Sequence, residues 1–359
     1  MGINSKSSLY YVRRNHPRGK ATPIITQGSI KILMKDMFQI AHISDPHLSR
    51  QHYREHIKSF KMLLRSMLNE GADHIIISGD IVSTAEEDDY YLAREILSNH
   101  QLLDSSKLTI VPGNHDIFGG PHRAVDVFSF PQHIRSVDYA RHTELFQSAF
   151  AETFQDVTRL NETSLFPFVK TVGPFNIIGL NSIPPWSFRQ NPLGTNGMLD
   201  DQQIDALEKL NSLGILADRT NIVVIHHHFN DLLQSDYEGG RLWTTIESNT
   251  MRMKKRKKII RLFQSFNVRY VLHGHIHRNE IYDRNGILFA NGAGAVCDDP
   301  VRFLKYNILQ YADGYCNIKI RQLSIPYQIS NVTVALHQYH KPLTIPAFAG
   351  KPLRSFTVQ

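Results

Sequence analysis

The sequence predicts an α/β protein, and three observations support this class. Short apolar segments that suit buried strands alternate with segments whose apolar spacing suits helices. Most of the apolar segments end in a turn with polar side chains. The composition, with 42% hydrophobic and 20% charged residues, is ordinary for a folded protein. Repeated strand, polar turn and helix are typical of βαβ units with a parallel sheet.

The expected strands and helices follow one another along most of the chain. Strands are indicated by short apolar runs bounded by turn residues, and helices by apolar side chains at intervals of three and four. Gly173 and Pro174 split one apolar stretch into a hairpin, and short β-type segments continue to about Ile320. We expect strands over residues 38–43, 74–77, 108–111, 166–170, 175–180, 221–225 and 268–272, and helices over residues 54–68, 86–97, 139–154, 199–210 and 259–266.

One main domain is expected, with a basic segment before it and an extended tail after it. The first 36 residues carry seven lysines and arginines against one acid, which suits a flexible leader. The alternative is a basic arm that contacts an acidic surface. Translation could also start at Met34 or Met37. Prolines after Ser324 indicate an extended tail. The expected division is a leader at 1–36, a domain at 37–323 with an insertion over the site at 118–165, and a tail at 324–359.

Charge, cysteines and hydropathy narrow the class of protein. The net charge of +7 favours an anionic partner without separating nucleotide, nucleic acid and acidic membrane. Cys297 and Cys316 have no disulfide framework or metal-ligand spacing, so a reducing compartment is expected. The sequence has no apolar run of the roughly 18 residues that a spanning helix needs. We expect a cytoplasmic protein that can attach peripherally to the inner membrane face.

Five expected strands end in turns that carry carboxylate, amide or imidazole groups. If the sheets align these ends, the side chains meet at one rim. Oxygen and imidazole ligands without thiolates suit Mn, Fe, Zn or Co, and seven candidate ligands fit two ions better than one, with one carboxylate bridging. His115 could protonate a leaving oxygen, and Asp116 could orient that imidazole. The candidate groups are Asp45 with His47, Asp80, Asn114 with His115 and Asp116, the run His226-His227-His228, and His275 with His277.

These motifs, in this order and spacing, resemble those of the calcineurin-like metallophosphoesterase family over roughly residues 38–297. The resemblance implies a two-sheet α/β sandwich flanked by helices, and two divalent metal ions. It implies that one metal is held by Asp45, His47 and His277, the other by Asn114, His227 and His275, and that Asp80 bridges them.

One motif departs from the family pattern. The phosphodiesterase branch usually has His-x-Pro after this strand, whereas Phe229 stands here in place of the proline. Aligning Phe229 with that proline selects His227 as the ligand, and leaves His226 as the less favoured choice.

A basic run, Lys254, Lys255, Arg256, Lys257 and Lys258, precedes the last expected helix. Such a run is commonly a solvated face. Because the start of this helix lies at the sheet edge where the preceding strand ends, the run could instead hold a second phosphate or dock on anionic headgroups.

The resemblance implies a hydrolase of phosphodiester or pyrophosphate bonds, with manganese the favoured metal. The basic run and the aromatic insertion favour a nucleotide-linked lipid precursor, UDP-2,3-diacylglucosamine of lipid A synthesis, as substrate. The alternatives are a 3',5'-cyclic-nucleotide phosphodiesterase and a catalytically inactive scaffold. A nuclease is less favoured because no nucleic-acid module accompanies the core, so no nucleic-acid partner is expected.

Overall fold

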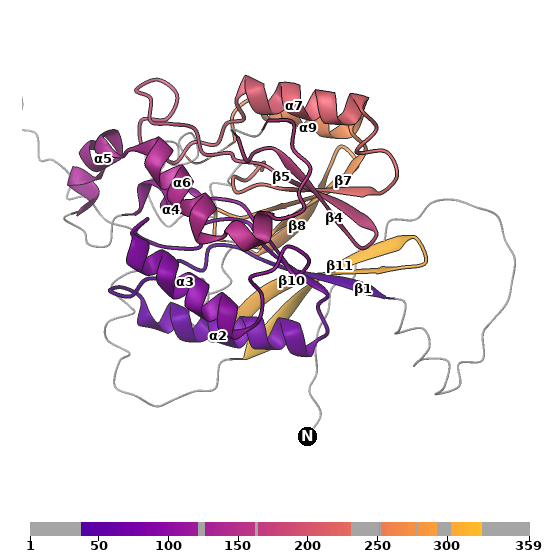
Figure 1. The fold of residues 1–359 in the computed structure, drawn as a ribbon, viewed down its shortest axis with the longest axis horizontal. Helices are drawn as coiled ribbons and strands as arrows, with labels where there is room; N and C mark the ends of the chain where they lie inside the picture. Colours follow the sequence, from indigo (N-terminus) through magenta and orange to yellow (C-terminus); the bar gives the residue numbers. More distant parts are fainter. Residues whose placement is uncertain are drawn as a thin grey trace, which may run out of the picture.

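The computed structural model describes residues 37–120, 126–161, 164–230, 251, 253–277, 279–292 and 303–324. This part of the chain has two β-sheets that lie between outer layers of helices (Figure 1). The expected two-sheet α/β sandwich is therefore confirmed. The predicted leader, and the predicted tail beyond Ser324, lie outside the described residues.

The first sheet is mixed rather than wholly parallel. Its strands lie in the order β11-β10-β1-β2-β3: β1 Phe38–Ile43, β2 His74–Ile77, β3 Leu108–Ile110, β10 Phe303–Ala312 and β11 Tyr315–Ser324. The three strands from the predicted βαβ units, β1, β2 and β3, pair in parallel. The long hairpin β10–β11 adds antiparallel to β1, so the C-terminal strands complete a sheet begun more than 200 residues earlier.

The second sheet has six strands in the order β4-β5-β6-β7-β9-β8. Its centre is parallel, from β5 through β6 and β7 to β9, and antiparallel hairpins place β4 and β8 at the edges. The predicted hairpin around Gly173 is confirmed as β4 and β5. The bounds are β4 Phe168–Val172, β5 Phe175–Gly179, β6 Thr220–Val224, β7 Val268–His273, β8 Glu280–Arg284 and β9 Ile287–Asn291.

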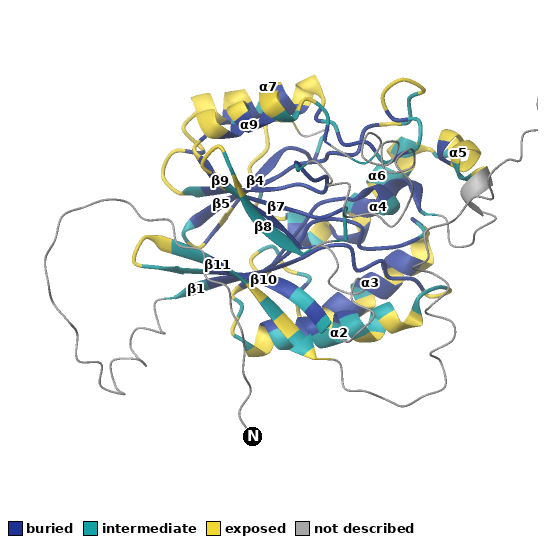
Figure 2. Cartoon of the chain, turned by 180° about the vertical axis from the view of Figure 1, so that it is seen from behind, coloured by how far each residue is buried: buried dark blue, intermediate teal, exposed yellow. Residues whose placement is uncertain are grey.

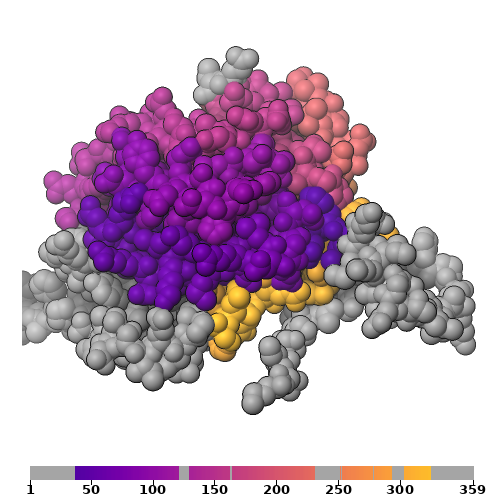
Figure 3. Space-filling model, turned by 60° about the horizontal axis from the view of Figure 1, so that its bottom comes forward, coloured from indigo at the N-terminus to yellow at the C-terminus, as the bar shows by residue number. Residues whose placement is uncertain are grey.

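Helices cover the outer faces of both sheets. α2 (Arg54–Asn69) and α3 (Glu87–Asn99) lie on the first sheet, and α7 (Asp201–Ser212) and α9 (Arg256–Ser265) on the second (Figure 1). Seen from below, α2 and α3 form a continuous surface beside the β10–β11 hairpin (Figure 3). Among the helices that the structure describes, none is long and apolar enough to cross a membrane.

The helices form where the sequence places apolar residues on one side. In α2 the buried residues Phe60, Leu63, Leu64 and Met67 recur at intervals of three and four. They join a large apolar cluster that also fills the space between the two sheets. A second cluster lies between the second sheet and the inner faces of α7 and α9, which are buried while their outer faces are exposed (Figure 2).

The expected insertion contains more helix than the sequence predicted. α5 (Asp126–Ser136) was not expected, because Pro131 lies inside it and proline removes a helical hydrogen bond. The predicted helix 139–154 is divided into α6 (Tyr139–Ala149) and a 3-10 turn, η2 (Ala151–Phe154). Apolar side chains of this region pack against α4 (Asn114–Phe118), the short helix that follows β3.

His74, at the start of β2, makes stability depend on pH. Its Nδ1 lies 2.8 Å from the Ser106 carbonyl oxygen and its Nε2 lies 2.8 Å from Thr109 Oγ1, and burial lowers its pKa to about 3. Between the ordinary pKa of 6.5 and this value, the unfolded chain binds a proton that the folded chain does not. The contribution of His74 to the free energy of unfolding should therefore fall as pH drops through this window, by about 1.4 kcal/mol per pH unit.

Urea denaturation of metal-free wild type and His74→Asn at pH 6.5, 5.5 and 4.5 tests this prediction. Asparagine retains an amide donor and an amide acceptor but does not titrate. The slope of the free energy of unfolding against pH should therefore be smaller in the variant by the contribution of one proton. His42 and His273, whose pKa values are also lowered to about 3 by burial, remain in both proteins. Equal pH slopes for the two proteins would contradict the prediction.

Candidate metal centre

The polar turns after β1, β2, β3, β6 and β7 meet at one edge of the sandwich. This convergence brings together side chains that are far apart in the sequence. The two most distant, Asp45 and His277, are separated by 232 positions. Their backbones are linked as well: Asp45 N donates to the Gly79 carbonyl, and Gly274 N to the His226 carbonyl. The carboxyl ends of the parallel strands thus form the site, as the order of the motifs predicted.

The first group consists of Asp45, His47 and His277, whose potential ligand atoms all lie within 4.8 Å of one another. The Nε2 atoms of His47 and His277 face each other at 2.9 Å. His277 Nε2 lies 3.5 Å from Asp45 Oδ1. This is the set that the family resemblance implied for one metal.

The second group consists of Asp80, His226 and His275, with Asn114 beside it. His226 Nε2 lies 3.1 Å from His275 Nδ1, 3.1 Å from Asn114 Oδ1 and 3.4 Å from Asp80 Oδ2. All four side chains are buried, and none is exposed by more than 5%. Asn114 and His275 are therefore placed as expected, with His226 between them.

Asp80 lies between the two groups. Its Oδ2 is 3.4 Å from His226 Nε2 and 3.8 Å from His47 Nε2. Burial alone would raise the pKa of the Asp80 carboxyl, but His226, His115 and His47 hold that pKa well below its usual range. In turn, burial disfavours a charged His226, yet the Asp80 carboxylate raises the pKa of His226 to about 9. The centre of the cluster therefore attracts positive charge.

The donor set fits divalent metal ions. Burial, followed by neighbouring imidazoles, lowers the pKa values of His47 and His275 well below the usual range, so these rings are neutral and can ligate. His275 Nε2 is buried without a hydrogen-bond partner in the described part of the chain. Carboxylate, amide and imidazole groups suit Mn, Fe, Zn or Co.

The backbone conformation of the ligand turns is unusual. Asp45, His47, Asp80, His275 and His277 all have positive φ values, between 43° and 78°. Non-glycine residues rarely adopt this region, and each such residue costs of order 1–3 kcal/mol. Five such residues in one cluster indicate that the interactions that hold these side chains in place offset the cost of the unfavourable backbone conformation.

Two glycines allow the turns to approach one another. A Cβ atom at Gly113 would lie 2.1 Å from Asp80 Oδ1, and one at Gly79 would lie 2.5 Å from His226 Nδ1. Gly79 also has a φ of 100°, which L side chains rarely adopt. The glycine before Asp80 and the glycine before Asn114 are therefore required by close packing.

The ring of His227, the ligand selected by alignment with Phe229, lies 4.5 Å from the His275 ring, but both of its nitrogens have partners outside this group. Its Nδ1 lies 2.8 Å from Ser182 Oγ and its Nε2 lies 3.1 Å from the Thr195 carbonyl oxygen. The two ring nitrogens of His227 thus have protein partners, whereas His226 Nε2 faces Asn114 and Asp80. In this geometry His226, and not the predicted His227, is the histidine grouped with Asp80, Asn114 and His275.

Strand periodicity could have identified His226. In β6, Ile222 and Val224 face the cluster between the sheets, whereas Val223 and Ile225 face the helices. Because side chains alternate along a strand, His226, two residues after Val224, also faces the first sheet. Asp80 and Asn114 follow strands of that sheet.

His115 lies at the rim of the cluster, as expected, but Asp116 does not orient it. The rings of His115 and His47 meet edge to face, 4.6 Å between centroids. His115 Nδ1 lies 3.4 Å from the Ser83 carbonyl, which takes the orienting role assigned to Asp116. The Asp116 carboxylate instead accepts hydrogen bonds from Val82 N and Gly113 N, at 2.9 and 2.8 Å.

Asp116 therefore stabilises the ligand turns. Burial, then the nearby Asp80 charge, raises the pKa of its carboxyl. Its two backbone contacts tie the turn after β2 to the start of α4. We infer a positioning role in place of the catalytic one.

The basic run lies at the same edge as the histidine turn. Met253 N donates to the His228 carbonyl at 3.3 Å, and an Arg256 guanidinium nitrogen donates to the Phe229 carbonyl at 2.9 Å. Lys254 Nζ donates to the Gln190 carbonyl. The exposed members of the run are Lys255, Lys257 and Lys258.

Two paired sheets whose strand ends converge on carboxylate, amide and imidazole groups define the class of metal-dependent phosphoesterases. The calcineurin-like phosphoesterase family model matches residues 38–279, and the chain belongs to this family. The family is dimetal-dependent, and the described residues contain three overlapping groups of possible ligands, the third being His47, Asp80 and His115.

Comparison with individual proteins supports the family and the fold. The glycerophosphodiester phosphodiesterase GpdQ of Enterobacter lignolyticus is 32% identical over 84 residues, which is 21% of this chain and 29% of GpdQ. The chain thus matches less than a third of that relative's length. A dimetal phosphatase from Danio rerio has a similar structure, with a TM-score of 0.51 at 12% identity, covering 82% of this chain and 100% of the phosphatase.

Proposed function

We propose that the chain hydrolyses a phosphodiester bond with two divalent metal ions. The observation that carries this proposal is Asp80, whose carboxylate lies between two ligand groups. In this proposal Asp80 bridges the two ions. The remaining ligands are Asp45, His47 and His277 for one ion and Asn114, His226 and His275 for the other.

Each part of the site has a separate role in this reaction. Two bound ions would lower the pKa of a water molecule and hold the phosphoryl oxygens. Asp45 is held for ligation by His275 N, which donates to its carboxylate at 3.0 Å. His115 has its Nδ1 directed at the Ser83 carbonyl, so Nε2 is the nitrogen that would give a proton to the leaving oxygen.

A phosphodiester is favoured over a pyrophosphate as substrate. The support is the local similarity to GpdQ, whose name is that of a phosphodiesterase. The nucleotide-linked lipid precursor expected from the sequence is supported only by the basic run and the aromatic composition of the insertion. Cyclic nucleotides remain an alternative within the phosphodiester class. An inactive scaffold is disfavoured because two complete ligand groups are assembled.

Metal reconstitution with a substrate panel tests the proposal. The full chain, stripped with chelator, is loaded separately with Mn²⁺, Fe²⁺, Zn²⁺ or Co²⁺ and its metal content is measured. Substrates are bis(p-nitrophenyl) phosphate, p-nitrophenyl phosphate, cyclic AMP and UDP-2,3-diacylglucosamine, with Asp80→Asn as the inactive control. We expect about two ions per chain and hydrolysis of the diester. No turnover of any substrate with any metal would refute the proposal.

The exposed lysines of the basic run are proposed to attract the anionic substrate. Lys257 and Lys258 lie in the first turn of α9, where cations oppose the helix dipole. Replacing both with glutamate should leave the thermal midpoint unchanged or raised, because acids favour this end of a helix. If the lysines attract substrate, KM should rise severalfold at low ionic strength while kcat is unchanged.

Lys107→Glu is the matched control, since Lys107 is exposed and precedes β3 at the opposite edge of the sheet. Sedimentation with anionic phospholipid vesicles would test the headgroup alternative on the same proteins. An unchanged KM and unchanged vesicle binding would assign the run to a solvated face.

A further inference from the structure

Strand β10 of the C-terminal hairpin brings a buried asparagine, Asn307, next to the metal centre. In the antiparallel pairing of the first sheet, Asn307 lies opposite His42 of β1, three positions before Asp45. The side chains of Asn307 and His42 are both fully buried. A polar side chain is costly to bury unless its hydrogen bonds are made, so the partners of Asn307 indicate its role.

The Asn307 amide joins the two sheets. Its Nδ2 donates to His42 Nδ1 in the first sheet at 3.1 Å, and to the Asn291 carbonyl at the end of β9 in the second sheet at 3.0 Å. An amide nitrogen has two hydrogen atoms, so both bonds can form together. Because a carbonyl can only accept, the contact with Asn291 identifies the amide nitrogen, and not the amide oxygen, as the atom at this position.

The bond to His42 leads to the turn that follows β2. Burial lowers the pKa of His42 to about 3, so the ring is neutral, and its Nδ1 accepts from Asn307. His42 Nε2 therefore carries the proton and donates to Ser78 Oγ at 2.9 Å. The Ser78 carbonyl lies 2.9 Å from His226 Nδ1. This contact makes Nδ1 the donor of the His226 ring and leaves Nε2 to face the other ligands.

The bond to Asn291 leads to the turn that follows β7. Asn291 Nδ2 donates at 3.4 Å to the carbonyl of Gly274, the residue before His275. A Cβ atom at Gly274 would lie 2.0 Å from Ser44 Oγ, so this turn packs directly on the turn that follows β1. The two hydrogen-bond chains that start at Asn307 thus end beside two members of the same ligand group, His226 and His275.

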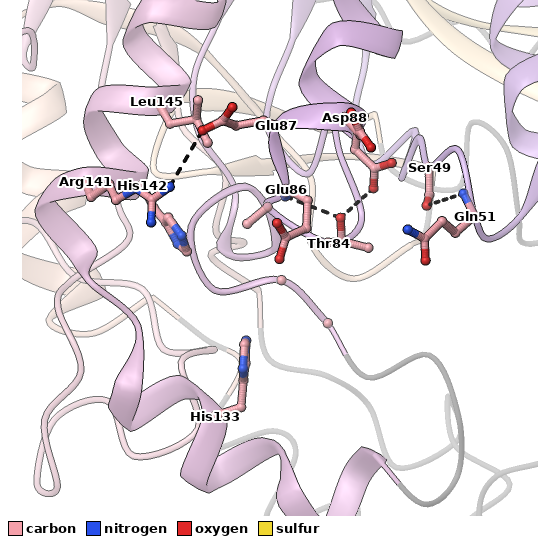
Figure 4. A pocket seen from close by; sticks show the side chains of 14 residues that line it. Ser49, Gln51, Thr84, Glu86, Glu87, Asp88, His133, Arg141, His142 and Leu145 are labelled. Carbon is pink, nitrogen blue, oxygen red and sulfur yellow. Dashed lines mark hydrogen bonds and ion pairs between the residues drawn. The ribbon is translucent and has the colours of Figure 1, made fainter.

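The region between α3 and the insertion provides no comparable support. A cavity of about 680 Å³ lies there, between the start of α3 and the helices α5 and α6 (Figure 4). None of the candidate metal ligands is among the residues that line it. On the side of β10, in contrast, His42, Ser78, Asn291 and Asn307 are fully buried, and hydrogen bonds connect them.

We propose that Asn307 is a positioning residue of the metal centre, which holds the turns carrying His226 and His275 in the geometry that one metal ion requires. It acts through the two hydrogen-bond chains described above. The hairpin β10–β11 lies beyond residue 279, where the match to the family model ends, so this support comes from outside the matched region. The inference rests on the two-metal site of the proposed function.

Metal binding by Asn307→Leu tests the proposal. Leucine is similar in size but has no donor, so both hydrogen bonds are lost. Mn²⁺ is titrated into the chelator-stripped full chain by isothermal titration calorimetry. We expect one of the two dissociation constants to rise by about 10- to 100-fold, as is typical when a group that orients a metal ligand is removed. The visible absorption spectrum of the Co²⁺-loaded variant should also change, because the coordination geometry of one ion is altered.

Asn221→Leu is the matched control. Asn221 is also fully buried, and its Nδ2 also donates to two carbonyls, those of Leu216 and Phe266. It lies at the start of β6, whereas the ligand turn follows the end of that strand. Both variants should lose stability, and only Asn307→Leu should bind metal more weakly. Wild-type affinity in Asn307→Leu, or an equal loss of affinity in both variants, would overturn the proposal.

A milder variant keeps the test decisive where Asn307→Leu does not fold. Ser78→Ala removes only the hydroxyl that accepts from His42, and it should weaken the binding of one ion by about fivefold, as expected for one hydrogen bond. Ser66→Ala is its control, because Ser66 Oγ lies 3.2 Å from the Tyr306 hydroxyl of the same hairpin and not beside a ligand turn. Equal metal affinities of Ser78→Ala and wild type would contradict the positioning role.

The metal titrations separate this inference from the proposed hydrolysis. A wild type that binds two ions but hydrolyses no substrate refutes the hydrolase proposal alone, and the loss of metal affinity in Asn307→Leu still supports the positioning role. A wild type that hydrolyses bis(p-nitrophenyl) phosphate, with unchanged metal affinity and Co²⁺ spectrum in Asn307→Leu, refutes this inference alone. A wild type that binds no metal refutes both.

Discussion

Replacing His226 with glutamine is expected to lower the metal content from about two ions per chain to about one, and kcat/KM by at least about 10²-fold. The reason is geometric. His226 Nε2 lies within 3.4 Å of Asp80 Oδ2, Asn114 Oδ1 and His275 Nδ1, so its loss removes the central nitrogen of one ligand group. Metal analysis after gel filtration and steady-state kinetics measure the two effects.

His227→Gln is the matched control, one residue along the chain and equally buried. Its ring contacts Ser182 and the Thr195 carbonyl, so the variant should keep two ions and lose thermal stability instead. The reverse result, with metal lost in His227→Gln and retained in His226→Gln, would restore the ligand assignment made from the sequence.

The strand-end motifs were predictable because parallel strands place their carboxyl ends at one edge. Asp45, Asp80 and Asn114 each follow an apolar strand within a few residues, and the sequence alone therefore indicated that they converge. The choice between His226 and His227 could not be made from the position of the strand end alone. It depended on which side of β6 each residue faces, and a motif with phenylalanine in place of proline could not decide that.

Other features depended on contacts that sequence patterns do not encode. The role of Asp116 is set by two backbone amides, one of them from Val82 in another turn. The antiparallel partner of β1 in the first sheet, β10, pairs with it over a sequence separation of more than 260 residues, and no local pattern specifies that pairing. α5 was missed because Pro131 argues against a helix locally, while the apolar packing of Ile134 with Phe118 favours one.

Replacing His115 with glutamine is expected to reduce kcat by about 10² to 10⁴ for diesters of alkyl alcohols, with the metal content unchanged. His115 N donates to Asp80 Oδ1 at 2.7 Å through the backbone, so the substitution retains that support of the ligand turn. The lost group is the imidazole, whose Nδ1 lies 3.4 Å from the Ser83 carbonyl.

The dependence on the leaving group separates proton donation from a merely structural role. An alkoxide needs a proton as it departs, whereas p-nitrophenolate is stable without one, so the loss in kcat should be much smaller for bis(p-nitrophenyl) phosphate. His100→Gln provides the control, because His100 Nδ1 also lies near a backbone carbonyl, that of Ile96, far along α3 from the site. A loss of the same size for both kinds of diester would show that His115 shapes the site and does not act as the acid, since a distorted metal centre slows every substrate alike.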